Sequence, residues 1–162
     1  MERRDYARGV MAGLAAGDRI GGPLAMARVL QASLEARGGL EVADLGARYL
    51  AWWTQGGFDA GRVSAAVFTR VAAGMSFEAA APEVHRACNG MTAGVNAAHR
   101  AAPLALCAAI ADDALADAAR AQARLTHLHP EAGHAAAAVV LLCRALIDGH
   151  AWPAALAWSR DC

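Results

Sequence analysis

The hydrophobic residues of this chain recur at the spacing of α-helices. In the stretch EVADLGARYLAWW, apolar side chains follow one another at intervals of one, three or four residues, whereas the charged residues fall between them. This arrangement gives one apolar face that can pack against a core and one polar face. The apolar positions are Val42, Leu45, Tyr49, Trp52 and Trp53.

Other segments carry signals for where helices begin and end. The stretch LAMARVLQASLEARGG places Ala27, Leu30 and Leu34 on one helix face and is predicted to stop at Gly38. A helix is expected to begin at Asp112 or Asp113, whose carboxylate can cap its amino end. A further helix is expected to begin at Pro130 and to end near Gly149.

No stretch alternates between apolar and polar residues in the way that predicts a β-strand. The predicted loops are short and rich in glycine or proline, with the sequences GDRIGGP, TQGGFDAG, CNGMTAG and HLHPEAG. We therefore predict a compact all-α domain of about seven to nine helices, formed by residues 1–162 as a single unit.

The charge balance excludes several classes of function. The formal net charge is zero and the chain has no basic run, so we expect no nucleic-acid partner. All fifteen basic residues are arginines. Without lysine, neither Schiff-base catalysis nor a phosphate-binding P-loop is available.

The cysteines and the apolar segments bear on location. The four cysteines are scattered without a C-x-x-C pair, which disfavours structural zinc and favours packed thiols in a reducing compartment. The longest apolar run, Ala135 to Cys143, is shorter than the ~20 residues that span a bilayer. The amino-terminal residues do not form a convincing signal peptide. We expect a soluble, cytoplasmic protein with no membrane partner.

The stretch RLTHLHPEAGHAA contains three of the six histidines of the chain. Taken alone, His127, His129 and His134 with Glu131 suggest a zinc site. However, His127 and His129 flank a single residue at the start of a helix, so their side chains point apart, and His134 lies a turn further on. We expect no metal here, and we expect His129 and His134 to be solvated or helix-capping residues.

Four stretches resemble motifs of the ADP-ribosylglycohydrolase family and follow one another in the family's order. GVMAGLAAGDRIGGP is similar to the opening helix and Gly-Asp turn of the family, and LGARYLAWWTQGGFDAG to its ARRYLAWYRxGGxDxG segment. GVNAAHRAAPLAL resembles GNGAAMRxAPLGL, and RLTHLHPEAGHAAAAV resembles RLTHxHPEAxxAA. The four stretches cover most of this chain and correspond to the amino-terminal half to two-thirds of a typical member.

The resemblance implies an all-α hydrolase that removes ADP-ribose from proteins or small molecules. Members of the family hold two magnesium ions with carboxylates, and the ions orient the ribose and the attacking water. Cleavage at the ribose C1 atom develops oxocarbenium character, so water, diol and leaving group have to be held in place.

This chain departs from the family at the positions of the metal ligands. When the second helix is aligned, the family's Asp-Asp-Thr motif falls on Gly22, Pro23 and Leu24, and a family glutamate falls on Ala25. The family's second metal motif, Asp-x-Asp-Thr, has no counterpart in residues 1–162, and Val95 stands where the family has an asparagine. We therefore expect no dinuclear magnesium site and no cofactor.

Three polar positions from these motifs are open to two interpretations each. Asp18 is either a turn residue that caps a backbone amide or a carboxylate that faces the cleft as an acid or base. Asp59 either caps the next helix or lines the cleft. Arg100 belongs either to an ordinary helix connection, in a structural ion pair, or to a loop that binds phosphate or carboxylate together with Asn96 and His99.

By the resemblance, His127 occupies a family position that contacts ribose and phosphate. The first functional hypothesis is a metal-independent enzyme for a small molecule, in which Asp18, His127 and His99 transfer protons and Asn96, Arg100, Asp59 and Thr126 bind the ligand. The alternative is a non-catalytic binding or regulatory module for ADP-ribose-like or other anionic, nucleotide-like ligands. A third hypothesis is a remnant that a partner completes, for which we expect a homo-oligomer or a hetero-complex.

Overall fold

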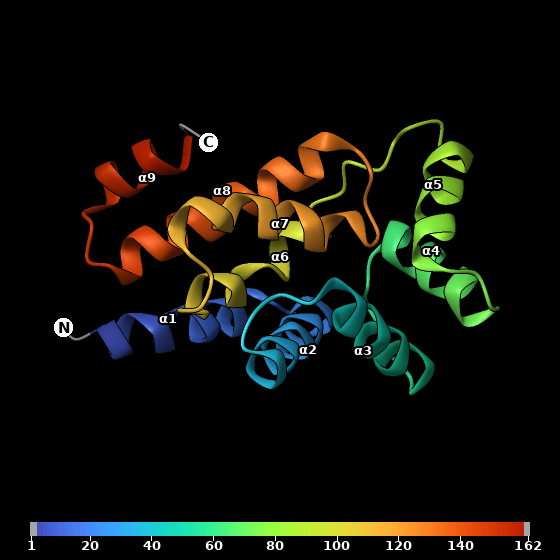
Figure 1. Cartoon of the computed structure of the whole chain (residues 1–162), viewed down its shortest axis with the longest axis horizontal. Helices are drawn as coiled ribbons and strands as arrows, with labels where there is room; N and C mark the ends of the chain where they lie inside the picture. Colours follow the sequence, from blue (N-terminus) through green and yellow to red (C-terminus); the bar gives the residue numbers. More distant parts are fainter. Residues whose placement is uncertain (1–2, 161–162) are drawn as a thin grey trace.

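The computed structural model describes residues 3–160, and this part of the chain is helical, with no β-strand. The predicted all-α fold is therefore confirmed (Figure 1). The α-helices are α1 (Arg3–Gly17), α2 (Gly22–Arg37), α3 (Val42–Thr54), α4 (Arg62–Ala72), α5 (Phe77–Ala87), α6 (Asn96–His99), α7 (Leu115–Arg124), α8 (Pro130–Ile147) and α9 (Trp152–Arg160), and two 3₁₀ turns are η1 (Ala102–Leu106) and η2 (Asp112–Ala114).

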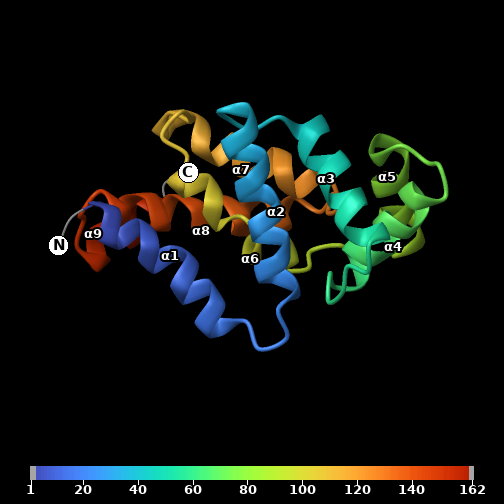
Figure 2. The same ribbon diagram turned by 90° about the horizontal axis from the view of Figure 1, so that it is seen from below.

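Helix α8 is the central element of the fold. It packs most extensively against α7 and also contacts α9, α6, η1 and α1. The antiparallel pair α4 and α5 forms one end of the molecule, and α1 and α9 lie at the opposite end (Figures 1 and 2). Helices α2 and α3 pack against each other between these two ends.

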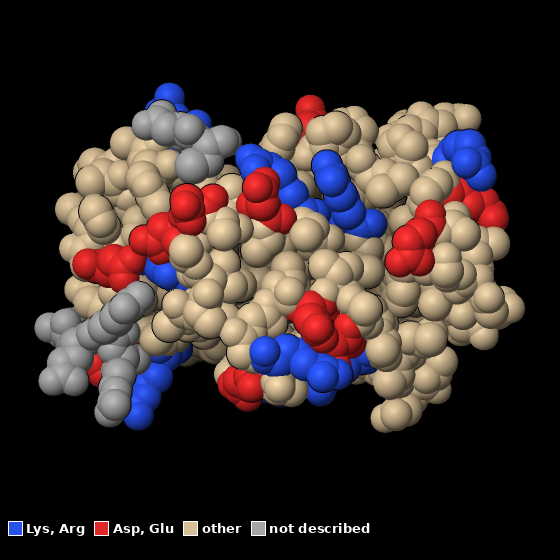
Figure 3. All heavy atoms as spheres, viewed as in Figure 1, with Lys and Arg blue, Asp and Glu red and all other residues tan. Residues whose placement is uncertain are grey.

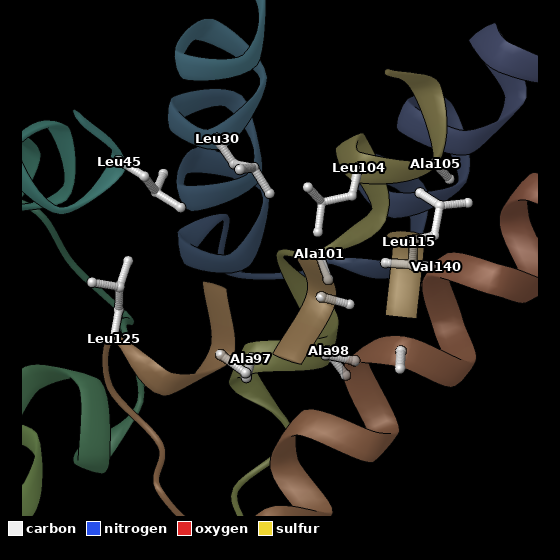
Figure 4. Packing of buried hydrophobic residues seen from close by; sticks show 14 of the residues in the cluster. Leu30, Leu45, Ala97, Ala98, Ala101, Leu104, Ala105, Leu115, Leu125 and Val140 are labelled. Atoms are coloured by element: carbon white, nitrogen blue, oxygen red, sulfur yellow. The ribbon is translucent and has the colours of Figure 1, made fainter. Parts of the chain in front are cut away.

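The core is made of a few large side chains and many alanines. Figure 4 shows leucines from α2, α3, η1 and α7 directed into one interior, with alanines of α6 beside α8. Because alanine projects only a methyl group, the backbones of α6, η1 and α8 can approach closely. A second, smaller cluster joins α4 to α5 through Val67, Val71, Ala80, Ala81 and Val84.

Most predicted helix ends coincide with those of the structure. Helix α2 ends at Gly38, whose φ of 69° is in the left-handed region that glycine adopts without strain. Helix α8 begins at Pro130, and the turn after it contains Gly149 with a φ of 88°. His129 is the N-cap of α8, and its Nδ1 accepts a hydrogen bond from the Glu131 amide at 3.3 Å. The prediction that His129 is a capping residue is thereby confirmed.

Two predicted caps are wrong. Helix α7 begins at Leu115 after the turn η2, and no aspartate side chain caps it, because the Asp112 carboxylate accepts a hydrogen bond from Arg144 instead, at 2.8 Å. Asp59 does not cap α4, whose N-cap is Gly61 without a side-chain hydrogen bond. Asp59 lies two residues before this N-cap and has a left-handed φ of 49°, whereas an N-cap residue has β-region backbone angles.

Arg144 ties the segment between η1 and η2 to α8. Its side chain is buried, and it donates hydrogen bonds to the backbone carbonyls of Ala105, Cys107 and Ile110 at 2.9, 2.8 and 3.3 Å. A segment without regular helix has backbone carbonyls that need partners when they are buried. One guanidinium therefore satisfies three of them and fixes the path of this segment.

The surface and the longest helix bear on where the protein can reside. Charged residues of both signs are dispersed over the face shown in Figure 3, with wide uncharged areas between them. By length and apolar composition α8 could cross a membrane, yet half of it is buried inside the protein. Its contacts with α7, α9 and α6 are those of a core helix.

The glycines of α1 and α2 provide a matched pair of stability predictions. A methyl group on Gly22 would collide with the backbone carbonyl of Asp59, whereas one on Gly13 would meet no atom within 4 Å. We expect Gly22→Ala to lower the free energy of unfolding by about 1–3 kcal/mol because the site becomes overpacked. Gly13→Ala is expected to raise it by up to ~1 kcal/mol, since alanine favours helix. Urea unfolding followed by circular dichroism measures both, and equal midpoints for the two variants would contradict this close approach.

Candidate functional site

Two adjoining hollows on the surface contain most of the predicted site residues. The first, of about 450 Å³, lies between the end of α1 and the turn that follows it, and Asp18 lines it. The second, of about 410 Å³, lies between the start of α4 and the segment around α6, and Asn96 and His127 line it. Both hollows are lined by Pro23, Asp59 and His99, so we treat them as one groove.

Asp18 closes the turn between α1 and α2. One carboxylate oxygen accepts hydrogen bonds from the amides of Gly21 and Ile20 at 2.7 and 3.2 Å, and the other accepts from Leu24 at 2.8 Å. Burial acts to raise the pKa of Asp18, but these backbone hydrogen bonds and the nearby His99 together lower it. Asp18 therefore accepts hydrogen bonds from backbone amides of this turn, as the first interpretation expects, and it also lines the groove.

Asp59 and His99 are exposed where the two hollows meet. The backbone of Asp59 lies directly against Gly22, where no side chain larger than hydrogen fits. The glycine at this position thus lets the loop that contains Asp59 approach the start of α2. His99 ends the short helix α6, and its exposure leaves the imidazole free to meet a ligand from solvent.

Arg100 lies behind the groove and is completely buried. Its Nε donates to the side-chain oxygen of Gln122 at 3.0 Å, and its Nη2 donates to the Gln122 carbonyl at 3.2 Å and to the Thr126 hydroxyl at 2.9 Å. Its Nη1 lies 3.3 Å from Asn96 Oδ1 and 3.4 Å from Ser64 Oγ.

The charge of Arg100 has no carboxylate opposite it within residues 3–160. No aspartate or glutamate of this part of the chain forms an ion pair with Arg100, so the structural ion pair of the first interpretation is absent there. Instead the guanidinium carbon lies 5.0 Å from the centre of the Tyr49 ring, a cation–π distance. Burial raises the pKa of Tyr49 to about 12 against the opposing effect of Arg100, and the Tyr49 hydroxyl has no hydrogen-bond partner within residues 3–160.

Thr126 connects Arg100 to His127. The Thr126 hydroxyl lies 2.8 Å from Nδ1 of His127. His127 is only 2% exposed, and its Nε2 lies beside Gly94, which also lines the groove. The Nε2 edge of this buried imidazole therefore lies beside the groove, where a ligand can meet it.

The surroundings of His127 keep it neutral. Burial and, to a smaller extent, the positive charge of Arg100 lower the pKa of His127 to about 3. At neutral pH the imidazole carries one proton and no charge. A group with so low a pKa is a weak general base, but it remains a hydrogen-bond donor through the nitrogen that bears the proton.

The structure places the seven predicted site residues at two depths. Asp18, Asp59, Asn96, His99 and His127 line the groove, and Arg100 and Thr126 lie beneath it. The three residues predicted to transfer protons do not form one hydrogen-bonded set within the described residues, because Asp18 bonds to backbone amides and His127 to a hydroxyl.

Sequence reasoning missed three residues that surround Arg100, namely Tyr49, Ser64 and Gln122. A signal was available for two of them. Gln122 shares the buried face of α7 with Ala119, and Ser64 precedes Phe68 by one turn on the buried face of α4. A polar residue on an otherwise apolar helix face is buried and needs a partner.

The residues that the structure describes do not fit the magnesium ions that the family resemblance implies. By that resemblance, the family's first metal motif falls on Gly22, Pro23 and Leu24, none of which has a side-chain oxygen. Within residues 3–160, no three or more His, Cys, Asp or Glu side chains gather as a metal site would require. The same observation applies to the zinc site that the histidine-rich stretch suggests when it is taken alone.

The low pKa of His127 predicts a specific dependence of stability on pH. The pKa is about 3 in the folded chain and 6.5 in a typical unfolded one, so on acidification the unfolded state takes up the proton first. The contribution of His127 to stability is then complete above pH 6.5 and is lost as the pH falls towards 3.

We expect the free energy of unfolding of the wild type to fall with decreasing pH more steeply than that of His127→Gln, by up to about 1.4 kcal/mol per pH unit. Urea titrations between pH 7 and pH 4 measure the difference. His134→Gln, which removes an exposed histidine, is the control and should follow the wild type. Parallel pH profiles for wild type and His127→Gln would contradict a neutral, buried His127.

The comparison with protein families agrees with the motifs. The model of the ADP-ribosylglycohydrolase family matches residues 1–161, nearly the whole chain. A search of curated proteins and a search of solved structures return no match. The family match, the all-α fold and the helix-start motif that carries His127 together confirm the resemblance, and the chain belongs to the ADP-ribosylglycohydrolase family.

Proposed function

We propose that this chain is a binding or regulatory module that holds an anionic, nucleotide-like small molecule, such as ADP-ribose, in the groove. The observation that carries the proposal is the buried guanidinium of Arg100, which has no ion-pair partner in the described residues. It bonds to Asn96 and, through Thr126, connects to His127, and both Asn96 and His127 line the groove. A charge that no carboxylate neutralises attracts an anion placed above it.

Positively charged side chains also border the rest of the groove. Arg19 lines the first hollow and Arg62 the second, so two further guanidinium groups border the space. Of the two aspartates in the lining, Asp18 already accepts three backbone hydrogen bonds. Arginine is well suited to phosphate, since its planar fork can donate two parallel hydrogen bonds.

The size and polarity of the groove also suit a ligand of this class. The two hollows, of about 450 and 410 Å³, each fall in the range of small-molecule sites, which is ~300–1,000 Å³. The Asn96 amide and the His127 ring provide donors for ribose or phosphate oxygens. Family membership makes an ADP-ribosyl group the first ligand to test.

Binding is better supported than acid–base catalysis. Proton transfer needs groups whose pKa lies near the operating pH. The hydrogen bonds to Asp18 lower its pKa despite its partial burial, and the pKa of His127 is about 3. Both groups are therefore fixed in one protonation state at neutral pH.

We expect ADP-ribose to stabilise the protein against heat in the presence of EDTA. At a ligand concentration of about 100 times the dissociation constant, the gain is ~2.7 kcal/mol in the free energy of unfolding. Differential scanning fluorimetry and isothermal titration calorimetry measure the effect. The variant Arg62→Gln should weaken binding several-fold, whereas Arg160→Gln, at the exposed end of α9, should bind like the wild type.

Two outcomes would overturn this proposal. No thermal shift and no heat of binding with ADP-ribose, AMP or pyrophosphate would exclude a nucleotide-binding groove. Release of ADP-ribose from an ADP-ribosylated arginine substrate in EDTA, abolished by His127→Gln, would show instead that the chain is a metal-independent enzyme.

A further inference from the structure

We propose that Arg100 is a positioning residue that acts through the Thr126 hydroxyl to hold His127 in the tautomer with its proton on Nε2. The groove then presents a fixed hydrogen-bond donor, which selects ligands that place an acceptor oxygen, of a phosphate or of a sugar hydroxyl, against that edge of the imidazole. The part of this inference that concerns the ligand rests on the proposed function, whereas the part that concerns the tautomer does not.

The direction of each hydrogen bond follows from the chemistry of the groups. A guanidinium can only donate, so Thr126 Oγ1 accepts from Nη2 of Arg100 at 2.9 Å. The hydroxyl has one hydrogen left to donate. Thr126 is 1% exposed, and Nδ1 of His127, at 2.8 Å, is the acceptor that the structure provides for it.

The opposite arrangement leaves a buried donor without a partner. If His127 carried its proton on Nδ1, Thr126 Oγ1 would accept from both Arg100 and His127, and its own hydrogen would have no acceptor among the hydrogen bonds of the described residues. An unsatisfied buried donor is unfavourable, and the positive charge of Arg100 further polarises the hydroxyl as a donor. The tautomer with its proton on Nε2 therefore prevails.

The nitrogen that bears the proton faces the groove. His127 Nε2 has no hydrogen-bond partner among residues 3–160, and it lies 3.3 Å from the position that a side-chain carbon on Gly94 would occupy. Gly94 lines the same hollow as His127 and Asn96. The absence of a side chain at Gly94 thus leaves open the approach to the donor.

The donor and acceptor nitrogens of this imidazole are the reverse of those in a histidine activated by a carboxylate. A carboxylate next to Nδ1 accepts the Nδ1 proton and leaves Nε2 free to abstract another. Here the group next to Nδ1 is a hydroxyl that a buried arginine turns into a donor. The arrangement therefore presents a donor for recognition and withholds the lone pair that a general base needs.

The tautomer can be measured without any ligand. In the ¹⁵N-labelled full chain at neutral pH, long-range ¹H–¹⁵N correlation spectra distinguish Nε2–H from Nδ1–H histidines, and His127→Gln identifies the signals of His127. We expect the Nε2–H pattern in the wild type and in Thr126→Ser, which keeps the hydroxyl. Thr126→Val, which removes it at similar volume, should give a mixture of tautomers, as should Arg100→Met.

Affinity for ADP-ribose provides the second measurement. Thr126→Val should bind about tenfold more weakly than the wild type, and Thr126→Ser should bind within a factor of about two. Gly94→Ala is the matched control for access, because its methyl group crowds Nε2 and does not touch Thr126. It should keep the Nε2–H pattern and still lose affinity.

The outcomes separate this inference from the proposed function. An Nδ1–H pattern in the wild type, or an unchanged Nε2–H pattern in both Thr126→Val and Arg100→Met, would overturn the role of Arg100. If those two variants do not fold, the wild type and Thr126→Ser still decide the tautomer. An Nε2–H pattern in a wild type that does not bind ADP-ribose, AMP or pyrophosphate would overturn the proposed function and the ligand part of this inference, while the positioning role of Arg100 would stand.

Discussion

At the centre of this molecule lies the buried guanidinium of Arg100, which has no carboxylate opposite it among residues 3–160. A guanidinium removed from water is strongly unfavourable unless its N–H groups find acceptors. Around Arg100 these acceptors are neutral oxygens from α4, α6, α7 and the segment after α7, and an aromatic ring of α3 covers its face. Four helices that share few other polar contacts therefore have to converge on this side chain.

The same interaction links the interior to the groove. Arg100 donates hydrogen bonds to Asn96 and Thr126, and Thr126 in turn bonds to His127. Asn96 and His127 line the groove, and Thr126 precedes His127 in the chain. Under the binding function proposed above, stability and recognition therefore depend on the same side chains. The family's usual arrangement of carboxylates around metal ions has no equivalent in the described residues, where the site is organised around a cation that belongs to the protein.

Much of the helical framework could be predicted from the sequence, since apolar periodicity, Pro130, Gly38 and Gly149 report local conformational preferences. The predicted caps at Asp59 and Asp112 were wrong because a side-chain cap also depends on backbone angles and on competing partners. Arg144, which donates a hydrogen bond to Asp112, is 32 residues away from it in sequence. Contacts of this kind are decided by tertiary packing, which periodicity does not encode.

The candidate site illustrates the same limit. The resemblance to the family identified Asp18, Asn96, His99 and His127, and all four line the groove. The resemblance did not indicate what Arg100 does, because its partners Gln122 and Thr126 follow it by 22 and 26 residues and carry no charge. From sequence alone, an arginine is expected to pair with a carboxylate. The packing of α6 against α7 shows that neutral oxygens accept its hydrogen bonds instead.

Helix α1 forms one wall of the groove, and little of its surface is buried in the fold. From residue 5 to residue 17, α1 has no buried residue, although Gly13, Leu14 and Gly17 line the first hollow. Segments with little buried surface open locally at a small fraction of the global free energy of unfolding, and their amides exchange with solvent first. A molecule bound in that hollow therefore contacts a helix that has no buried residue between positions 5 and 17. Ligand binding in the groove and the protection of the α1 amides from exchange are then thermodynamically coupled.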